Sequence, residues 1–279
     1  MSKARIEARF AACKAEGRAA FVAYVMAGDP DADTALEILK GLPAAGADLI
    51  ELGFPFSDPM AEGPPIQRAA QRALADGMTP RKTLDFVRAF REQDQDTPII
   101  MMGYMNPLVS WGFRAFAEQA AAAGVDGLIV VDCPPEEAEP LADALDAADI
   151  ALIRLATPTT DDARMSVVVR RTSGFVYYVS VAGVTGVKEA DADAVAPAVV
   201  RVRAASGLPV AVGFGIKTPE RAAAVARVAD GVVVGSAFVD AVAEALESGG
   251  AETVTARVLS KVESLAKAVR DARREAATV

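Results

Sequence analysis

The chain has 279 residues, of which 52% are hydrophobic and 24% charged, and it contains no histidine. This absence excludes Ser–His–Asp and Cys–His nucleophile pairs, histidine-ligated zinc and an imidazole general base, so acid–base chemistry must use Asp, Glu, Lys, Tyr or Cys. The net charge of −9 argues against binding to nucleic acid or to an anionic membrane. Two cysteines, Cys13 and Cys133, are too few for a disulfide framework and the N-terminus lacks an apolar signal segment, so we expect a cytoplasmic protein.

Eight short apolar runs recur along the chain, each followed by a helical pattern. Their near-continuous hydrophobicity is typical of parallel strands that are buried on both faces. The runs begin near Phe21, Leu49, Pro98, Gly127, Ala151, Phe175, Val210 and Gly231. Most of the starts lie 21 to 35 residues apart, the size of a βαβ unit. We therefore predict an α/β fold in which residues 1–279 form a single (β/α)8 barrel domain, with an extra N-terminal helix and extra loop segments. An open doubly wound sheet is the alternative.

Several helix boundaries are also marked in the sequence. Thr34 and Glu37 have the spacing of a capping box, and Thr218 precedes a proline at a first helical position. The segment 134–137 places two acidic residues where a helix dipole favours them. At the C-terminus, residues 252–276 carry apolar side chains three and four positions apart, which predicts a closing amphipathic helix.

The longest spacing between runs follows a run that contains a glutamate. Glu51 lies in LIELG, where a charge is costly unless it is neutralised, paired or functional. An ion-paired or outward-facing side chain is one interpretation, but a carboxylate at the C-terminal end of a barrel strand points at the active-site mouth, which favours catalysis. The segment 53–67 adds Asp58 and Glu62 among four prolines. By itself this segment is typical of a structural loop, but next to Glu51 its carboxylates can divide acid and base roles.

Glycines close the last three runs. They lie at 183–186 after the sixth run, at 213–215 after the seventh, and at Gly235, before Ser236, after the eighth. One Gly-x-Gly sequence usually marks only a tight turn, but glycines in these positions of a barrel commonly present amide groups to a phosphate. The three loops together predict a phosphate site.

Other residues on the runs have weaker interpretations. Asp132, after the fourth run, suits a helix cap or a polar ligand contact. Arg154, within the fifth run, has no explanation from the sequence. Three residues could line an apolar pocket or fill the barrel: Tyr24, Met102 and Tyr104. Tyr177 and Tyr178 alternate along the sixth run, so one of them should face inward, where core packing is the simpler interpretation.

Four blocks of sequence carry a specific resemblance. They are ELGFPFSDPMAEGPPIQRAAQRAL from Glu51, AGVTG from Ala182, VGFGI from Val212 and VVVGSAFV from Val232. Together they closely resemble the tryptophan synthase α chain family, and the resemblance extends from about Phe21 to the C-terminal helix. It implies a (β/α)8 barrel lyase that cleaves indole-3-glycerol phosphate to indole and glyceraldehyde 3-phosphate, without a metal or organic cofactor in this chain.

The resemblance also assigns roles to residues. Glu51 would be the acid–base that protonates the indole ring at C3 and helps to remove the proton of the glycerol hydroxyl. Glu62 would assist at the indole N–H, although the family usually has aspartate there, so the loop must adjust to a longer side chain. Val181 stands where some members have a basic residue. The implied substrate-binding residues are Tyr24, Met102, Tyr104, Ile129, Tyr177, Gly186, Gly215, Gly235 and Ser236.

A partner chain follows from the same resemblance. Pro55 and Asp58 fall where the family contacts its β chain, which carries pyridoxal phosphate and receives indole through a tunnel. The expected assembly is a heterotetramer with two copies of each chain.

Two other functions remain open at this point. One is another phosphate-binding barrel enzyme: an aldolase, an isomerase or an indole-glycerol-phosphate synthase. A Schiff-base aldolase needs a lysine at the end of a strand, and none of the eight runs contains one. The other is a barrel that mainly activates its partner and has little chemistry of its own.

Overall fold

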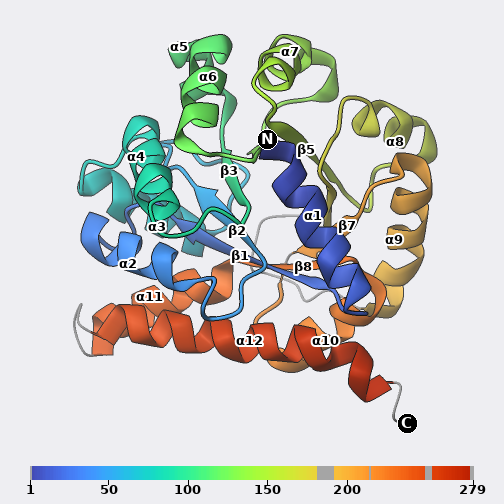
Figure 1. Ribbon diagram of the computed structural model, residues 1–279. Helices are drawn as coiled ribbons and strands as arrows, with labels where there is room; N and C mark the ends of the chain where they lie inside the picture. Colours follow the sequence, from blue (N-terminus) through green and yellow to red (C-terminus); the bar gives the residue numbers. More distant parts are fainter. Residues whose placement is uncertain (1, 181–191, 214, 249–252, 277–279) are drawn as a thin grey trace.

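The computed structural model describes residues 2–180, 192–213, 215–248 and 253–276, in which eight parallel strands form a closed barrel (Figure 1). Each strand pairs with the next one in the chain, and β8 pairs with β1. The strands are β1 (Ala20–Met26), β2 (Leu49–Gly53), β3 (Ile99–Gly103), β4 (Gly127–Val130), β5 (Ala151–Ala156), β6 (Val176–Val179), β7 (Val210–Gly213) and β8 (Gly231–Val234). The predicted barrel is confirmed, and the open sheet is excluded.

Helices surround the barrel and cover its outer face (Figure 1). They are α1 (Ser2–Ala15), α2 (Ala32–Gly41), α3 (Pro64–Ala75), α4 (Pro80–Arg91), α5 (Met105–Trp111), α6 (Phe113–Ala123), the short 3₁₀ helix η1 (Pro135–Glu137), α7 (Glu139–Ala147), α8 (Asp162–Val169), α9 (Ala192–Ser206), α10 (Pro219–Val228), α11 (Ser236–Ser248) and α12 (Val254–Ala276). The long spacing after β2 arises because two helices, α3 and α4, follow one loop there. In the part of the chain that the structure describes, no helix is long and apolar enough to cross a membrane.

The predicted helix boundaries are partly right. Thr218 caps α10 by accepting a hydrogen bond from a backbone N–H of the first turn, and Pro219 follows it as expected. The capping box at Thr34 is wrong, because α2 begins earlier: the Asp31 carboxylate accepts from the Thr34 N–H. The closing helix is confirmed as α12, and its apolar face packs against α2, α10 and α11 (Figure 1).

The N-terminal helix closes one end of the barrel. Ile6 and Phe10 of α1 belong to the cluster of side chains that fills the barrel interior. A Cβ placed on Gly127 would lie 3.2 Å from Ile6, and one placed on Gly231 would lie 3.3 Å from Phe10. Because these glycines open β4 and β8, α1 lies against the N-terminal ends of the strands. The opposite end, where the strands finish, is left for a site.

A repeated aspartate contact fastens the N-terminal ends of the strands. An aspartate directly precedes each of β2, β4 and β8. Its carboxylate accepts a hydrogen bond from a backbone N–H at the start of the preceding strand and forms an ion pair with an arginine. The three sets are Asp48 with the Phe21 N–H and Arg18, Asp126 with the Ile99 N–H and Arg91, and Asp230 with the Val210 N–H and Arg203. Each aspartate thus satisfies a donor that would otherwise lack a partner and fixes two strands together.

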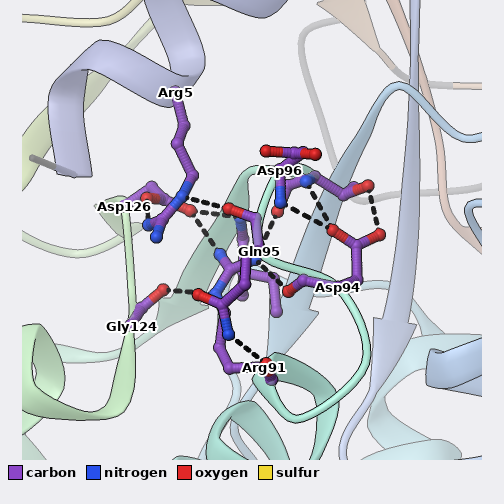
Figure 2. A network of polar contacts seen from close by, with 9 residues as sticks. Arg5, Arg91, Asp94, Gln95, Asp96, Gly124 and Asp126 are labelled. Carbon is purple, nitrogen blue, oxygen red and sulfur yellow. Dashed lines mark hydrogen bonds and ion pairs between the residues drawn. The ribbon is translucent and has the colours of Figure 1, made fainter.

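The Asp126 contact is the centre of a larger network (Figure 2). Its two carboxylate oxygens accept from Arg5 of α1 at 2.7 Å and from Arg91 of α4 at 2.6 Å, and Asp126 is fully buried. Arg91 also donates to the Gly124 carbonyl, and Arg5 to the Gln95 carbonyl. The network therefore joins α1 and α4 to the start of β4.

Candidate active site

A cavity lies at the C-terminal end of the barrel, over the ends of several strands. Its lining residues come from β1, β2, β3, β6 and β8, from α3, and from the loops after β2, β7 and β8. They are Tyr24, Glu51, Glu62, Ile66, Met102, Tyr177, Gly215, Ile216, Val233, Gly235 and Ser236.

Strand register brings Glu51 into this cavity. Glu51 on β2 pairs with Tyr24 on β1, so their side chains lie on the same face of the sheet. The Glu51 side chain is only 2% exposed. Gly53, two residues further along β2, leaves room for the tyrosine: a Cβ there would lie 2.5 Å from the Tyr24 hydroxyl. The sequence LIELG thus places a carboxyl and a phenol side by side.

Glu62 reaches the same cavity from the loop between β2 and α3. It is 6% exposed. Its backbone is held on both sides, because its N–H donates to the Pro59 carbonyl at 3.0 Å and its carbonyl accepts from the Gln67 amide at 2.9 Å. The helix α3 begins two residues later at Pro64, where a missing N–H costs nothing. The proline-rich loop therefore turns Glu62 inward rather than into solvent.

Burial controls the protonation of the two carboxyls. Burial, and then the charge of Glu62, raises the pKa of Glu51 to about 8. Burial alone raises the pKa of Glu62 to about 7. No lysine or arginine is among the described residues that line the cavity. Near neutral pH, Glu51 therefore holds its proton while Glu62 is partly ionised, so the cavity holds a proton donor beside a carboxylate.

One side of the cavity is formed by glycines and by the start of a helix. Gly215 follows β7 with a φ of +71°, a conformation that favours glycine. Gly235 and Ser236 follow β8, and Ser236 opens α11, a helix of 13 residues. The first N–H groups of a helix lack partners within it and attract anions. This side of the cavity is thus suited to an oxyanion or phosphate group.

The remaining predicted site residues are distributed differently. Met102 and Tyr177 line the cavity. Ile129 packs in the same barrel-interior cluster as Tyr177 but is not among the lining residues, and Tyr104 lies beside the loop of Glu62. Gly186 and Val181 lie outside the described residues.

Three lining residues were not predicted from sequence: Ile66, Ile216 and Val233. Ile66 and Ile216 directly follow the quoted proline and glycine motifs, and that position was the available signal.

The loop residues expected to face a partner differ in exposure. Asp58 is exposed and accepts a hydrogen bond from the Ser57 hydroxyl, whereas Pro55 is buried. Asp132 accepts from the N–H of Met105, the first residue of α5, at 2.8 Å. Arg154, which the sequence could not explain, donates to the Cys133 carbonyl at 2.8 Å and so supports the loop after β4.

Comparison with known proteins identifies the family of the chain. A family model described as tryptophan synthase alpha chain matches residues 10–270. The chain belongs to the tryptophan synthase alpha chain family. Its similarity to individual members is high: the tryptophan synthase alpha chain of Phenylobacterium zucineum is 80% identical over 274 residues, covering 98% of each chain. That of a Caulobacter species is 72% identical over 277 residues, covering 99% of this chain and 100% of the other.

Solved structures of the family show the same fold. Tryptophan synthase subunit alpha from Legionella pneumophila superposes with a TM-score of 0.88 at 40% identity, covering 95% of this chain and 98% of the other. A chain of Mycobacterium tuberculosis tryptophan synthase gives a TM-score of 0.86 at 37% identity, covering 95% and 98%. The predictions of this family, of its lyase class and of its barrel fold are confirmed.

Proposed function

We propose that the cavity of this barrel binds indole-3-glycerol phosphate and cleaves it to indole and glyceraldehyde 3-phosphate, with Glu51 and Glu62 as the catalytic carboxyls. The observation that carries the proposal is the pair of buried glutamates in one cavity, with no described cation beside them. The cleavage is a retro-aldol reaction, which requires one proton to be delivered to carbon and one to be removed from a hydroxyl.

The two carboxyls divide this work according to their protonation. Glu51, which keeps its proton near neutral pH, protonates C3 of the indole ring, and the positive charge appears on the indole nitrogen. The Glu62 carboxylate accepts a hydrogen bond from the indole N–H and stabilises that charge. Glu51, now ionised, takes the proton of the hydroxyl on the carbon attached to the ring. The C–C bond breaks, its electrons return to the ring, the aldehyde forms, and Glu51 ends with the proton with which it started.

The other lining residues would bind the two ends of the substrate. The amide groups around Gly215, Gly235 and Ser236 hold the phosphate, which explains how an acidic chain takes a phosphorylated substrate. Tyr24, Met102 and Tyr177 contact the indole ring, and Ile66, Ile216 and Val233 add apolar surface near them. Gly186 is proposed as a further phosphate contact by resemblance alone.

The assembly is proposed on family grounds. We propose a tryptophan synthase β chain as the partner, in a heterotetramer with two copies of each chain, and Asp58 and Pro55 as part of the contact. Pyridoxal phosphate is expected only in that β chain. We also propose that residues 1–279 form one barrel domain and that the protein is cytoplasmic.

An indole-release assay tests the proposal. The purified chain is given indole-3-glycerol phosphate, with and without added β chain, and indole and glyceraldehyde 3-phosphate are measured. We expect equal amounts of the two products from the chain alone, formed faster when the β chain is present. Consumption of the substrate without indole would indicate a different barrel reaction, and no consumption in either assay would refute the lyase.

A further inference from the structure

The loop that carries Glu62 is wrapped around one side chain that does not line the cavity. Tyr104 follows β3, is 3% exposed and precedes the first residue of α5. The Phe56 ring stacks on the Tyr104 ring, with centroids 5.2 Å apart and planes 30° apart. Five residues later, the Ala61 N–H donates to the Tyr104 hydroxyl at 3.0 Å. The loop thus touches both the face and the hydroxyl of this tyrosine.

The second of these contacts lies directly beside the reacting group. Ala61 is the residue before Glu62, so its peptide group fixes the start of the Glu62 backbone. The next two polar groups of that backbone are already held: the Glu62 N–H by Pro59 and the Glu62 carbonyl by Gln67. Tyr104 supplies the one contact in this set that comes from a barrel strand end rather than from the loop or α3. It therefore ties the loop to the rigid barrel.

The Tyr104 hydroxyl is suited to accept this hydrogen bond. Burial, and then the Glu62 carboxyl, raises the pKa of Tyr104 above its ordinary value, so the side chain stays a neutral hydroxyl throughout the range in which the enzyme works. The other titratable groups that interact with Glu62 are Glu51, Tyr24 and Tyr177. None of them contacts the Ala61 peptide in the described contacts, so the loop contact can be tested separately from the charges.

We propose that Tyr104 is a positioning residue that holds Glu62 in the cavity through the Ala61 peptide, rather than a wall of the indole site. The inference rests on the proposed role of Glu62. Catalytic placement is sensitive to about 1 Å, and a loop held only by its own contacts leaves a carboxyl less well fixed than one tied to the barrel.

The test is Tyr104→Phe, which removes the hydroxyl and keeps the ring stacked on Phe56. Losing one neutral hydrogen bond predicts a kcat for indole release that falls roughly three- to tenfold. KM should stay within roughly twofold, because the proposed substrate contacts are untouched. The acidic limb of the pH–kcat profile should move down toward the ordinary glutamate pKa, because a displaced Glu62 is better solvated. Tyr178→Phe is the matched control, because Tyr178 is also buried but lies on the outer face of β6. This substitution should leave kcat, KM and the acidic limb of the pH–kcat profile unchanged.

A double-mutant cycle with Glu62→Gln separates the possible outcomes. If Tyr104 acts through Glu62, then adding Tyr104→Phe to Glu62→Gln lowers kcat no further. Two results would overturn the inference alone: an unchanged kcat and acidic limb in Tyr104→Phe, or losses that multiply in the double mutant, as expected of an independent substrate contact. If Glu62→Gln itself released indole at the wild-type rate, the proposed role of Glu62 would fail, and the inference with it.

Discussion

The pH dependence of indole release follows from the burial of the two glutamates. In the proposed mechanism the reaction needs Glu51 protonated, as the donor to carbon, and Glu62 ionised, as the partner of the indole N–H. Since burial raises the pKa of Glu62 to about 7, activity is lost as the pH falls below that value. Since the pKa of Glu51 is raised to about 8, activity is also lost as the pH rises above that value. The profile is therefore bell-shaped, and its two limbs belong to the coupled pair.

The expected size of the effect follows from these two values. With limbs at 7 and 8, the active protonation state makes up about 60% of the enzyme at pH 7.5, and about 9% at pH 6 and at pH 9. The value of kcat should therefore fall about sevenfold on each side of the optimum. If both glutamates had ordinary pKa values near 4.3, both limbs of the profile would lie at much more acidic pH.

The measurement is kcat for indole release between pH 5.5 and 9.5 at saturating substrate. Saturation matters because, below it, ionisation of the free substrate phosphate, with a second pKa of about 6, also changes the rate. Glu62→Gln is the control, and it should remove the acidic limb while the alkaline limb remains. A profile without an acidic limb between pH 5.5 and 9.5 would show that burial does not tune these carboxyls.

Two further predictions concern the scaffold. Asp126→Ala leaves Arg91 buried without its carboxylate partner and should lower the free energy of unfolding, measured in urea, by about 3–5 kcal/mol. The control, Asp85→Ala, breaks an exposed ion pair and should lower the free energy of unfolding by less than about 1 kcal/mol. Equal losses would refute the role of the buried network. Gly53→Ala puts a methyl group 2.5 Å from the Tyr24 hydroxyl. We expect the barrel to fold and the KM for the substrate to rise, and an unchanged KM would contradict the placement of Tyr24.

The strands could be predicted from the sequence because each carries its signal locally. Runs such as GVVVGS read as doubly buried strands, and eight of them at βαβ spacing leave few topologies. The start of α2 could not be predicted correctly in the same way. Asp31 and Thr34 are both good capping residues, and the choice between them depends on the backbone, which is extended at Asp31, rather than on residue type.

The candidate site was predicted only in part, for a similar reason. Glu51 could be predicted because a charge inside an apolar strand is unusual, and Glu62 because it shares a motif with it. Tyr104 was grouped with the pocket residues, since an aromatic residue at a strand end commonly lines a barrel mouth. Its hydroxyl instead contacts a peptide group 43 residues earlier in the chain, and no local pattern encodes such a contact. Arg154 is similar, because its partner is a backbone carbonyl 21 residues away.

The most direct test of the account is indole release by Glu51→Gln. The substitution keeps the shape of the side chain and removes its ability to give and take the proton, while circular dichroism verifies the fold. General acid–base groups contribute about 10²- to 10⁴-fold, so we expect kcat to fall by that amount with a similar KM. A variant that releases indole at the wild-type rate would contradict the central claim that the buried Glu51 carboxyl performs the proton transfers.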